Sequence, residues 1–506
     1  MSGMRGRAAA PRTGENWEGT VAADLAGMTG MNAPTQLLIG GQWSAGRAGV
    51  LPVIDPATED PIAEVANATV EDALDAVAAA HAALPGWSAT PPRTRAECLR
   101  RAYELMIADA EKLARLMVLE NGKALKDARA EVTYAAEFFR WFAEEAVRLD
   151  GMVTTAPSGA NKILVLHQPV GVAVLVTPWN FPAAMATRKI GPALAAGCTV
   201  VLKPAKETPL SALAVAAILR EAGVPDGVVN VVTTATAGPV VAAMLADPRV
   251  RKLSFTGSTE VGRVLLRAAA GTVTNCSMEL GGNAPFLVFG DADVDAAVDG
   301  AMIAKMRNGG EACTAANRFY VHESVAEEFS ARFAARLAAL TVGPGLQDGT
   351  DVGPLVNADT RSKVATLVEG AAKEGGRVVT GGVAPDRRGY FYAPTVLDQV
   401  PPTAAILSEE IFGPVAPIVR FTDTDQAIAM ANATEYGLVS YVYTADLRRA
   451  LRVSEALESG MVGINRGVVS DPAAPFGGVK QSGLGREGGH WGLLEFTEAK
   501  YIAVDW

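Results

Sequence analysis

The chain has 506 residues, 49% hydrophobic and 20% charged, so it can bury a large core and is not globally disordered. Its net charge of −10 argues against a nucleic-acid partner, because phosphates are bound by clustered lysines and arginines. Four cysteines without a Cys-x-x-Cys pair exclude a disulfide scaffold and disfavour a zinc site, so we expect no bound metal.

The N-terminal segment is not expected to be a secretory signal, and its acidic residues disfavour, without excluding, a transit peptide. It carries three arginines but no apolar stretch of the kind found in a secretory signal. We expect residues 1–33 to form a flexible tail, with Met28 and Met31 as alternative starts. No later run reaches the roughly 20 apolar residues of a membrane span, so we expect no membrane association. A cytoplasmic location is expected, since free thiols persist there.

Three helices are predicted before residue 150. Apolar positions recur every three or four residues over 69–84, 94–120 and 123–149. Thr69 and Asp72 have the spacing of a capping box at the start of the first helix.

Strands and helices then alternate. Strands are predicted over 170–176, 199–202, 228–232 and 252–255, and helices over 183–196, 210–221, 238–246 and from 258 onward. The strands are continuous apolar runs, which is typical of a parallel sheet covered by helices on both faces. This pattern predicts a doubly wound nucleotide-binding domain whose ligand lies at the carboxyl ends of the strands.

A second α/β unit is predicted from about residue 280. The alternation starts again there, with strands expected over 284–289, 318–321, 377–379 and 415–420. The sequence has no internal repeat, so the two units are not copies of one another.

Two glycine-containing segments are candidates for binding a dinucleotide. Gly483, Gly485 and Gly488 form a G-x-G-x-x-G motif, but no strand is predicted before it and no βαβ unit follows it. Residues 254–262 fit better, because they follow the fourth strand and open a helix. The helix N-terminus and the Ser258 hydroxyl can bind a phosphate there.

Three segments carry candidate catalytic side chains. Cys313 follows Gly309 and Gly310, which make the approach to the thiol uncrowded and flexible. Glu279 precedes Leu-Gly-Gly, and Asn180 ends the first strand of the nucleotide-binding unit. Taken alone, a cysteine or a glutamate in such a segment is more often structural than catalytic, and the asparagine can be a simple turn residue.

A cysteine hydrolase of the papain type is the chemical alternative. Such an enzyme needs a histidine base, and none of the four histidines lies in a motif typical of catalysis. They are His81, His167, His322 and His490.

Taken together, the segments resemble the aldehyde dehydrogenase superfamily. The resemblance also rests on residues 202–204, 255–262 and 409–414, and it covers about residues 35–506. It implies an NAD(P)-binding domain over 34–150 and 169–279, a catalytic domain over 280–479, and a small β oligomerisation element over 151–168 and 480–506. It further implies a homodimer or a homotetramer.

The resemblance also implies roles for individual residues. Cys313 would attack the aldehyde carbon, and the Asn180 amide and the Cys313 N–H would hold the oxyanion. Glu279 would activate the water that hydrolyses the thioester, while Glu487 and Lys189 match positions suggested to relay protons. The residues that match cofactor contacts are Thr177, Pro178, Trp179, Lys203, Lys206, Gly257, Ser258, Leu280, Glu410 and Phe412.

One of these positions bears on the choice of cofactor. Many NAD-preferring members carry glutamate where this chain has Lys206. A lysine attracts a 2′-phosphate that a glutamate would repel, so NADP is the expected cofactor, with NAD possible.

Within the superfamily the sequence is most similar to succinate-semialdehyde dehydrogenases. Arg188, Arg307 and Ser470 match the positions that grip the distal carboxylate of that substrate. Two guanidinium groups suit a planar carboxylate and have no use for a neutral aldehyde. Glutarate semialdehyde stays open as a substrate, because one methylene changes discrimination by only about 1–3 kcal/mol.

The chain departs from the family pattern at two positions. Glu311 stands where glutamine is common, and an inward-pointing carboxylate there would disfavour the Cys313 thiolate. Ala315 stands where some members carry a second cysteine, so no local disulfide switch is expected.

Two further function classes remain open at this point. A non-catalytic member of the fold is disfavoured, because Asn180, Glu279 and Cys313 are all present. A member that releases its thioester with coenzyme A is disfavoured by Glu279, which suits water as the acceptor.

Overall fold

The computed structural model describes residues 25–505. Residues 1–24 of the predicted tail therefore lie outside the described residues. Its remaining part is packed against the core, which corrects the expectation of a flexible segment for residues 25–33. Leu25 and Ala33 are buried, and the Thr29 hydroxyl donates a hydrogen bond to the Leu25 carbonyl at 2.8 Å.

Residues 70–145 form four helices where three were predicted. They are α2 (Val70–Ala89), α3 (Pro92–Ala108), α4 (Ala110–Asn121) and α5 (Leu125–Glu145). The predicted helix over 94–120 is two helices, because the chain leaves helical geometry at Asp109 while the apolar spacing continues on either side. The capping box of Thr69 and Asp72 is present at the start of α2.

An eight-stranded sheet forms the first α/β unit, in the order β19-β11-β10-β7-β8-β9-β1-β2. Its strands are β1 (Leu37–Ile39), β2 (Gln42–Ser44), β7 (Val172–Val176), β8 (Thr199–Lys203), β9 (Val229–Val231), β10 (Val250–Thr256), β11 (Asn275–Glu279) and β19 (Gly483–Leu484). Strands β7 to β11 run parallel, whereas β1 and β19 join antiparallel.

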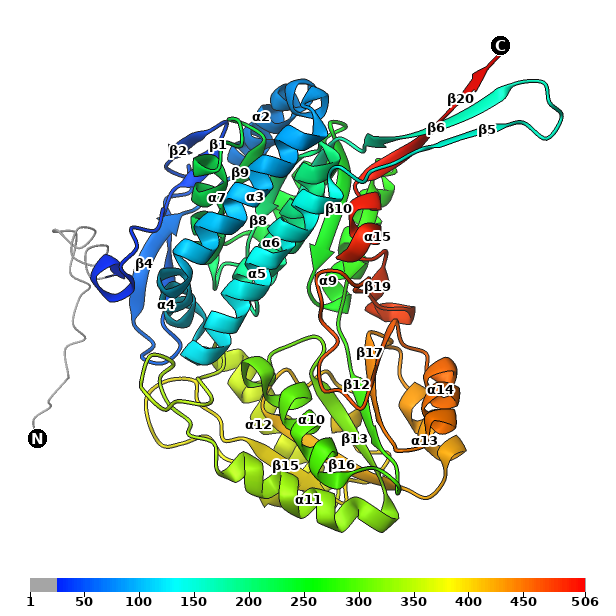
Figure 1. Cartoon of the computed structure of the whole chain (residues 1–506). Coiled ribbons are helices and arrows are strands. Elements are labelled where there is room, and N and C mark those ends of the chain that lie inside the picture. The colour runs from blue at the N-terminus through cyan, green and yellow to red at the C-terminus, as the bar shows by residue number, and fades with distance from the viewer. Residues whose placement is uncertain (1–24, 506) are drawn as a thin grey trace, which may run out of the picture.

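Helices cover both faces of this sheet, as predicted. The crossover helices are α6 (Pro182–Ala196), α7 (Pro209–Glu221), α8 (Ala237–Ala246) and α9 (Thr259–Ala270). Alternate residues of β7 enter two separate cores, Ala173 and Leu175 on one face and Val172 and Val174 on the other. Figure 1 shows α3, α5 and α6 side by side over one of these faces.

A seven-stranded sheet forms the second α/β unit, in the order β14-β15-β16-β13-β12-β17-β18. Its strands are β12 (Ala284–Val288), β13 (Ala316–His322), β14 (Arg377–Thr380), β15 (Thr395–Asp398), β16 (Val415–Phe421), β17 (Val439–Tyr443) and β18 (Met461–Ile464). Its helices are α10 (Val294–Met306), α11 (Glu323–Ala338), α12 (Ala358–Lys373), α13 (Thr424–Asn432) and α14 (Leu447–Ala456).

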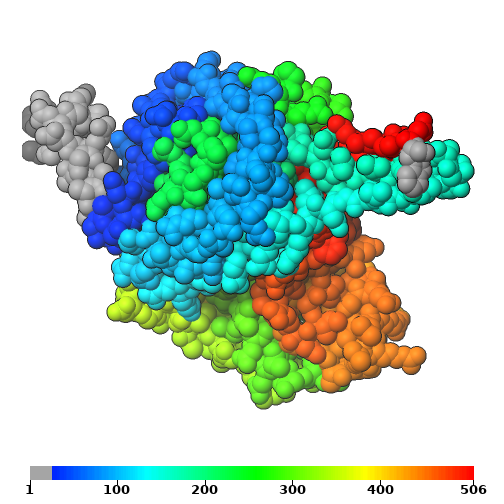
Figure 2. Space-filling model, turned by 45° about the horizontal axis from the view of Figure 1, so that its top comes forward, coloured from blue at the N-terminus to red at the C-terminus, as the bar shows by residue number. Residues whose placement is uncertain are grey.

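A three-stranded arm extends away from the body of the molecule (Figures 1 and 2). It is built from β5 (Met152–Thr155), β6 (Lys162–Pro169) and β20 (Thr497–Val504). Residues 480–506, expected to belong wholly to the oligomerisation element, are divided between two sheets. This expectation is corrected because β19 pairs with β11 of the eight-stranded sheet, and only β20, which follows α15 (Gly489–Leu494), reaches the arm.

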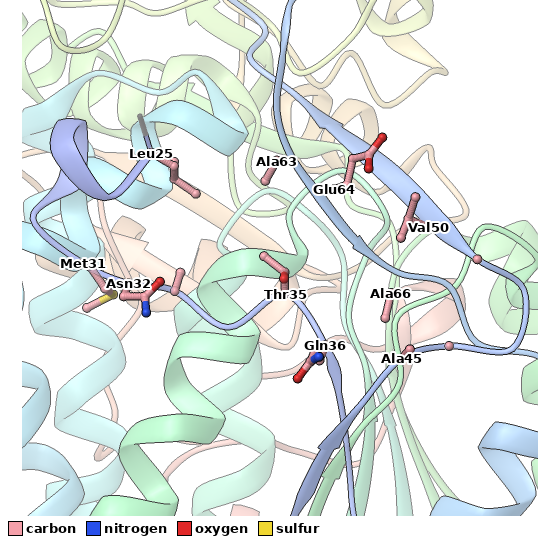
Figure 3. A pocket seen from close by; sticks show the side chains of 13 residues that line it. Leu25, Met31, Asn32, Thr35, Gln36, Ala45, Val50, Ala63, Glu64 and Ala66 are labelled. Carbon is pink, nitrogen blue, oxygen red and sulfur yellow. The ribbon is translucent and has the colours of Figure 1, made fainter. Parts of the chain in front are cut away.

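One cavity of about 360 Å³ lies beside β2 and the hairpin of β3 (Val50–Ile54) and β4 (Pro61–Ala66) (Figure 3). Its described lining is mostly apolar or small, and Glu64 is the one carboxylate there. None of the predicted site residues lines it. No helix within residues 25–505 is long and apolar enough to cross a membrane.

Candidate active site

A second cavity, of about 260 Å³, opens at the carboxyl ends of β7 and β10, where a parallel sheet is expected to bind its ligand. Both α/β units contribute to it. Its lining residues are Pro178, Trp179, Asn180, Met185, Thr256, Gly257, Ser258, Leu280, Gly281, Cys313, Thr360, Lys363, Glu410 and Phe412.

The cavity thus brings most of the predicted cofactor-binding positions together with two of the predicted catalytic residues, Asn180 and Cys313. The other three, Glu279, Lys189 and Glu487, do not line it. Sequence reasoning missed five residues of its lining: Met185, Thr256, Gly281, Thr360 and Lys363. Thr256 and Gly281 adjoin predicted residues, so proximity in sequence was a usable signal. Thr360 and Lys363 lie on α12, in a segment without any motif, and only the fold brings them here.

Cys313 follows a sharply constrained turn. Asn308, Gly309 and Gly310 all have left-handed φ angles, of 55°, 62° and 81°. A Cβ on Gly310 would lie 2.3 Å from the Gly413 carbonyl oxygen. The glycines are therefore required by backbone conformation and close approach, and not by the flexibility that we expected.

The Cys313 thiol is protonated in this environment at neutral pH. Burial raises its pKa to about 12, and the nearby Arg188 and Arg307 offset this effect only in part. The thiolate is the nucleophilic form, so the site needs a base. Glu279 is the candidate, since burial and then the charge of Glu487 raise its pKa well above the usual value. Neither of its carboxylate oxygens has a hydrogen-bond partner.

Glycines permit close backbone approach next to both Cys313 and Glu279. A Cβ on Gly282 would lie 2.4 Å from the Cys313 carbonyl oxygen, and one on Gly483 would lie 2.0 Å from the Met278 carbonyl oxygen. Gly483, with a φ of 146°, pairs directly with Glu279 at the edge of the sheet. The G-x-G-x-x-G motif therefore begins at a strand that flanks the candidate base.

Asn180 is fixed by hydrogen bonds at both its side chain and its backbone. Its Nδ2 donates to the Glu311 carbonyl at 3.1 Å, and its own carbonyl accepts from Lys123 Nζ at 2.7 Å and from Asn308 Nδ2 at 3.0 Å. An amide nitrogen carries two hydrogens, so a second N–H remains to stabilise an oxyanion.

Lys123 and Glu131 form a buried ion pair that sequence reasoning missed. Their atoms are 2.5 Å apart, and both side chains are at most 1% exposed. Glu131 also accepts from the backbone N–H groups of Ala183 and Ala184, at the start of α6. One carboxylate thus anchors both the helix N-terminus and the lysine that holds Asn180.

Glu487 is clamped between two cations. Lys189 Nζ lies 2.5 Å from one carboxylate oxygen, and the Arg188 guanidinium contacts the other. Burial alone would raise the pKa of Glu487, but Arg188 and Lys189 hold it below the usual value. Burial lowers the pKa of Lys189, an effect that Glu487 opposes.

The three residues predicted to bind a carboxylate are only partly brought together. Arg307 Nη1 lies 3.2 Å from Ser470 Oγ, and its guanidinium lies over the Phe181 ring at 4.9 Å. Arg188 is paired with Glu487, while it still affects the pKa of Cys313, as Arg307 does.

The remaining predicted residues fit the binding of a dinucleotide. Ser258 caps α9, whose N-terminus suits a phosphate, and the rings of Trp179 and Phe412 meet edge to face at 5.3 Å. Thr256 Oγ1 is buried without a partner, and Glu410 accepts from the Gly282 N–H at 3.0 Å. A polar group of a ligand can satisfy the Thr256 hydroxyl.

Three predicted cofactor positions lie outside this cavity. Lys203 ends β8 and is buried, which lowers the pKa of its ammonium group. Its carbonyl accepts from the Thr177 N–H at 3.2 Å. The Lys206 side chain is 62% exposed, 3.9 Å from Glu207.

The orientation of Glu311, open in the sequence, is clear in the structure. Its carboxyl group accepts from the Val356 N–H at 3.1 Å. It therefore points into the loop before α12, and burial raises its pKa to about 8. A neutral carboxyl group at this position does not oppose formation of the thiolate.

Residues 43–502 match the sequence model of the Aldehyde dehydrogenase family. The chain belongs to this family. Two relatives and one solved structure illustrate how it relates to other aldehyde dehydrogenases.

A succinate-semialdehyde dehydrogenase of Paenarthrobacter nicotinovorans is 57% identical over 88% of this chain and 98% of that protein. A glutarate-semialdehyde dehydrogenase of Pseudomonas putida is 49% identical over 93% of this chain and 97% of that protein. The crystal structure of an NADP-dependent enzyme from E. coli superposes with a TM-score of 0.93, at 47% identity, over 96% of this chain and 99% of that one.

Proposed function

We propose that the protein oxidises succinate semialdehyde to succinate, with NADP as the preferred hydride acceptor and NAD as an alternative. The observation that carries the proposal is the contact of Arg307 with Ser470, together with Arg188, near Cys313. Such guanidinium groups suit an aldehyde that ends in a carboxylate. The similarity to a succinate-semialdehyde dehydrogenase supports the same choice.

In this proposal Cys313 attacks the aldehyde carbon after its proton has been removed. The free Asn180 N–H and the Cys313 backbone N–H stabilise the oxyanion, and a donor of this type contributes about 3–4 kcal/mol. When bound, NAD(P) would serve as the hydride acceptor. Cys313 then carries a thioester, and Glu279 removes a proton from the water that hydrolyses it.

Glu279 suits this role because it is buried and unpartnered. A carboxylate with a raised pKa is a stronger base than one in water. Its retention favours water over coenzyme A as the acyl acceptor. Formation of an acyl-coenzyme A in the assay would contradict this choice.

Lys206 supports the preference for NADP. The side chain is exposed and separated from Glu207 by 3.9 Å, a weak contact that a 2′-phosphate can replace. Lys206→Glu should lower kcat/KM for NADP and raise the NAD-to-NADP ratio. A wild-type preference for NAD that this substitution leaves unchanged would contradict the proposal.

The test of the substrate is a small matrix of aldehydes and cofactors. Succinate semialdehyde is compared with butanal, which has the same carbon chain without the carboxylate, each with NADP and NAD. We expect kcat/KM to favour succinate semialdehyde by at least roughly tenfold, the value of one charge-assisted contact. A higher value for butanal would overturn the proposal. Glutarate semialdehyde is the second candidate, because a relative of similar identity acts on it.

We also propose a homodimer or homotetramer in a reducing, cytoplasmic compartment. The arm exposes apolar side chains, among them Val153 at 74% and Tyr501 at 60%. Exposed apolar patches of this kind are typical of subunit contacts. All four cysteines are free, which fits a reducing environment.

A further inference from the structure

Two consecutive cations of α6 converge on one carboxylate. Lys189 contacts one oxygen of Glu487 and Arg188 contacts the other. Neighbouring residues of a helix normally point in different directions. Both side chains are at most 1% exposed, so neither ion pair is a solvated surface contact.

Arg188 also packs against a residue that lines the cavity. One of its terminal nitrogens lies 3.2 Å from the sulfur of Met185, which lines the cavity around Cys313. The guanidinium carbon lies 4.3 Å from the centre of the Phe476 ring. One guanidinium therefore lies between a residue of the cavity lining and Glu487.

The two carboxylates of the site also influence each other. The charge of Glu487 contributes to the raised pKa of Glu279, and Arg188 and Lys189 act in the opposite direction. The backbone also brings their segments together, because a Cβ on Gly477 would lie 3.0 Å from Glu279 Oε1, and the N–H of the preceding Phe476 donates to the Glu487 carbonyl at 2.7 Å.

We propose that Arg188 couples recognition of an anionic aldehyde to the proton relay at Glu487. In the free enzyme Glu487 is the ion-pair partner of Arg188. The distal carboxylate of the substrate competes for the same guanidinium and leaves Glu487 paired with Lys189 alone. Loss of one cation raises the proton affinity of Glu487, so it accepts the proton that Glu279 takes from water. The inference rests on the proposed function, which supplies the anionic substrate.

The first test is Glu487→Gln, assayed with succinate semialdehyde and with butanal. Removing the internal competitor should lower KM for succinate semialdehyde by roughly 3- to 10-fold, the reciprocal of the fraction of molecules in which Arg188 is free. The KM for butanal should not change. The kcat should fall for both aldehydes, because the relay is lost.

Lys189→Gln is the matched control. Lys189 contacts the same carboxylate, so the substitution should lower kcat for both aldehydes, and because it leaves Glu487 paired with Arg188 alone it should not lower KM for succinate semialdehyde. A rise in KM for succinate semialdehyde with Glu487→Gln, or an equal change for both aldehydes, would overturn the coupling. If the wild-type protein prefers butanal, the proposed function itself is wrong.

A second measurement uses the unmodified protein and so does not depend on the folding of a variant. The rate of thioester hydrolysis is followed in single turnovers across pH. The acidic limb of the pH profile should lie at higher pH with succinate semialdehyde than with butanal. Glu487 must be deprotonated to accept a proton, and its pKa rises when the substrate carboxylate binds Arg188. Coincident limbs would overturn the inference.

Discussion

Burial raises the pKa of two acidic residues near Cys313. Glu279 and Glu311 both lie within the protein, and the pKa of each is raised for that reason. Their surroundings nevertheless differ, because Glu311 has a backbone donor in Val356 whereas Glu279 has none. Glu311 therefore stabilises a loop as a neutral group, whereas Glu279 is free to accept a proton.

Glu311→Gln should change how the stability of the protein depends on pH. The folded-state pKa of about 8 lies above the usual value of 4.5, so wild-type Glu311 increasingly opposes folding as pH rises from 4.5 to 8. Above pH 8 the effect is constant. The variant keeps the acceptor for the Val356 N–H and carries no charge. The thermal midpoint of the variant minus that of the wild type should therefore increase as pH rises from 5 to 8.

Glu327→Gln on α11 is the control, because Glu327 is exposed. Its difference from wild type should not vary over this range of pH. A pH-independent difference for Glu311→Gln would show that the carboxyl group is already ionised in the folded protein.

At the scale of elements, the start of α6 organises the site. The helix begins directly after Asn180 and Phe181, and the pair of Lys123 and Glu131 fixes its first turn. Lys123 lies in the short connection between α4 and α5, and Glu131 lies on α5, so this part of the chain supports the geometry of the oxyanion donor. Covering the sheet is only one of their roles.

Glu131→Gln should destabilise the protein by about 3–5 kcal/mol, because it leaves the buried Lys123 ammonium without its counter-charge. Unfolding in urea measures this loss. The kcat should also fall, since Asn180 loses part of its support.

The control is Glu111→Gln, which breaks an exposed ion pair with Arg129 and should cost less than about 1 kcal/mol. Equal losses for the two variants would contradict the role assigned to the buried pair.

At the scale of the whole molecule, the end of the chain joins the parts together. β19 pairs with the strand that carries Glu279, and Glu487 follows within a few residues. β20 then continues into the arm. A contact made on the arm therefore lies on the same stretch of chain as the candidate proton relay.

The arm is expected to mediate oligomerisation, and Val153→Asp tests this expectation. A charge on the exposed apolar surface of the arm should yield a smaller particle in size-exclusion chromatography with light scattering. Leu447→Asp on α14 is the control, since Leu447 is 71% exposed and lies outside the arm. An unchanged mass for Val153→Asp would contradict a role of the arm in assembly.

Much of the architecture follows from the sequence alone. Continuous apolar strands between amphipathic helices predict two α/β units, because this pattern is stable only when a parallel sheet is covered on both faces. The motifs around Asn180, Glu279 and Cys313 identify the family, and Asn180 and Cys313 line one cavity with Trp179 and Phe412. The roles of these residues remain predictions until they are assayed.

Other features depend on contacts between residues far apart in the chain. The partner of Arg188, the orientation of Glu311, and the arrival of Lys363 at the cavity are set by segments hundreds or tens of residues away. Local sequence encodes helix, strand and turn, whereas the pairing and protonation of a buried charge depend on what the completed fold places against it. The sequence by itself therefore determined the order of elements and the candidate chemistry. Only the tertiary structure decided which charges meet, because burial removes the water that would otherwise solvate them separately.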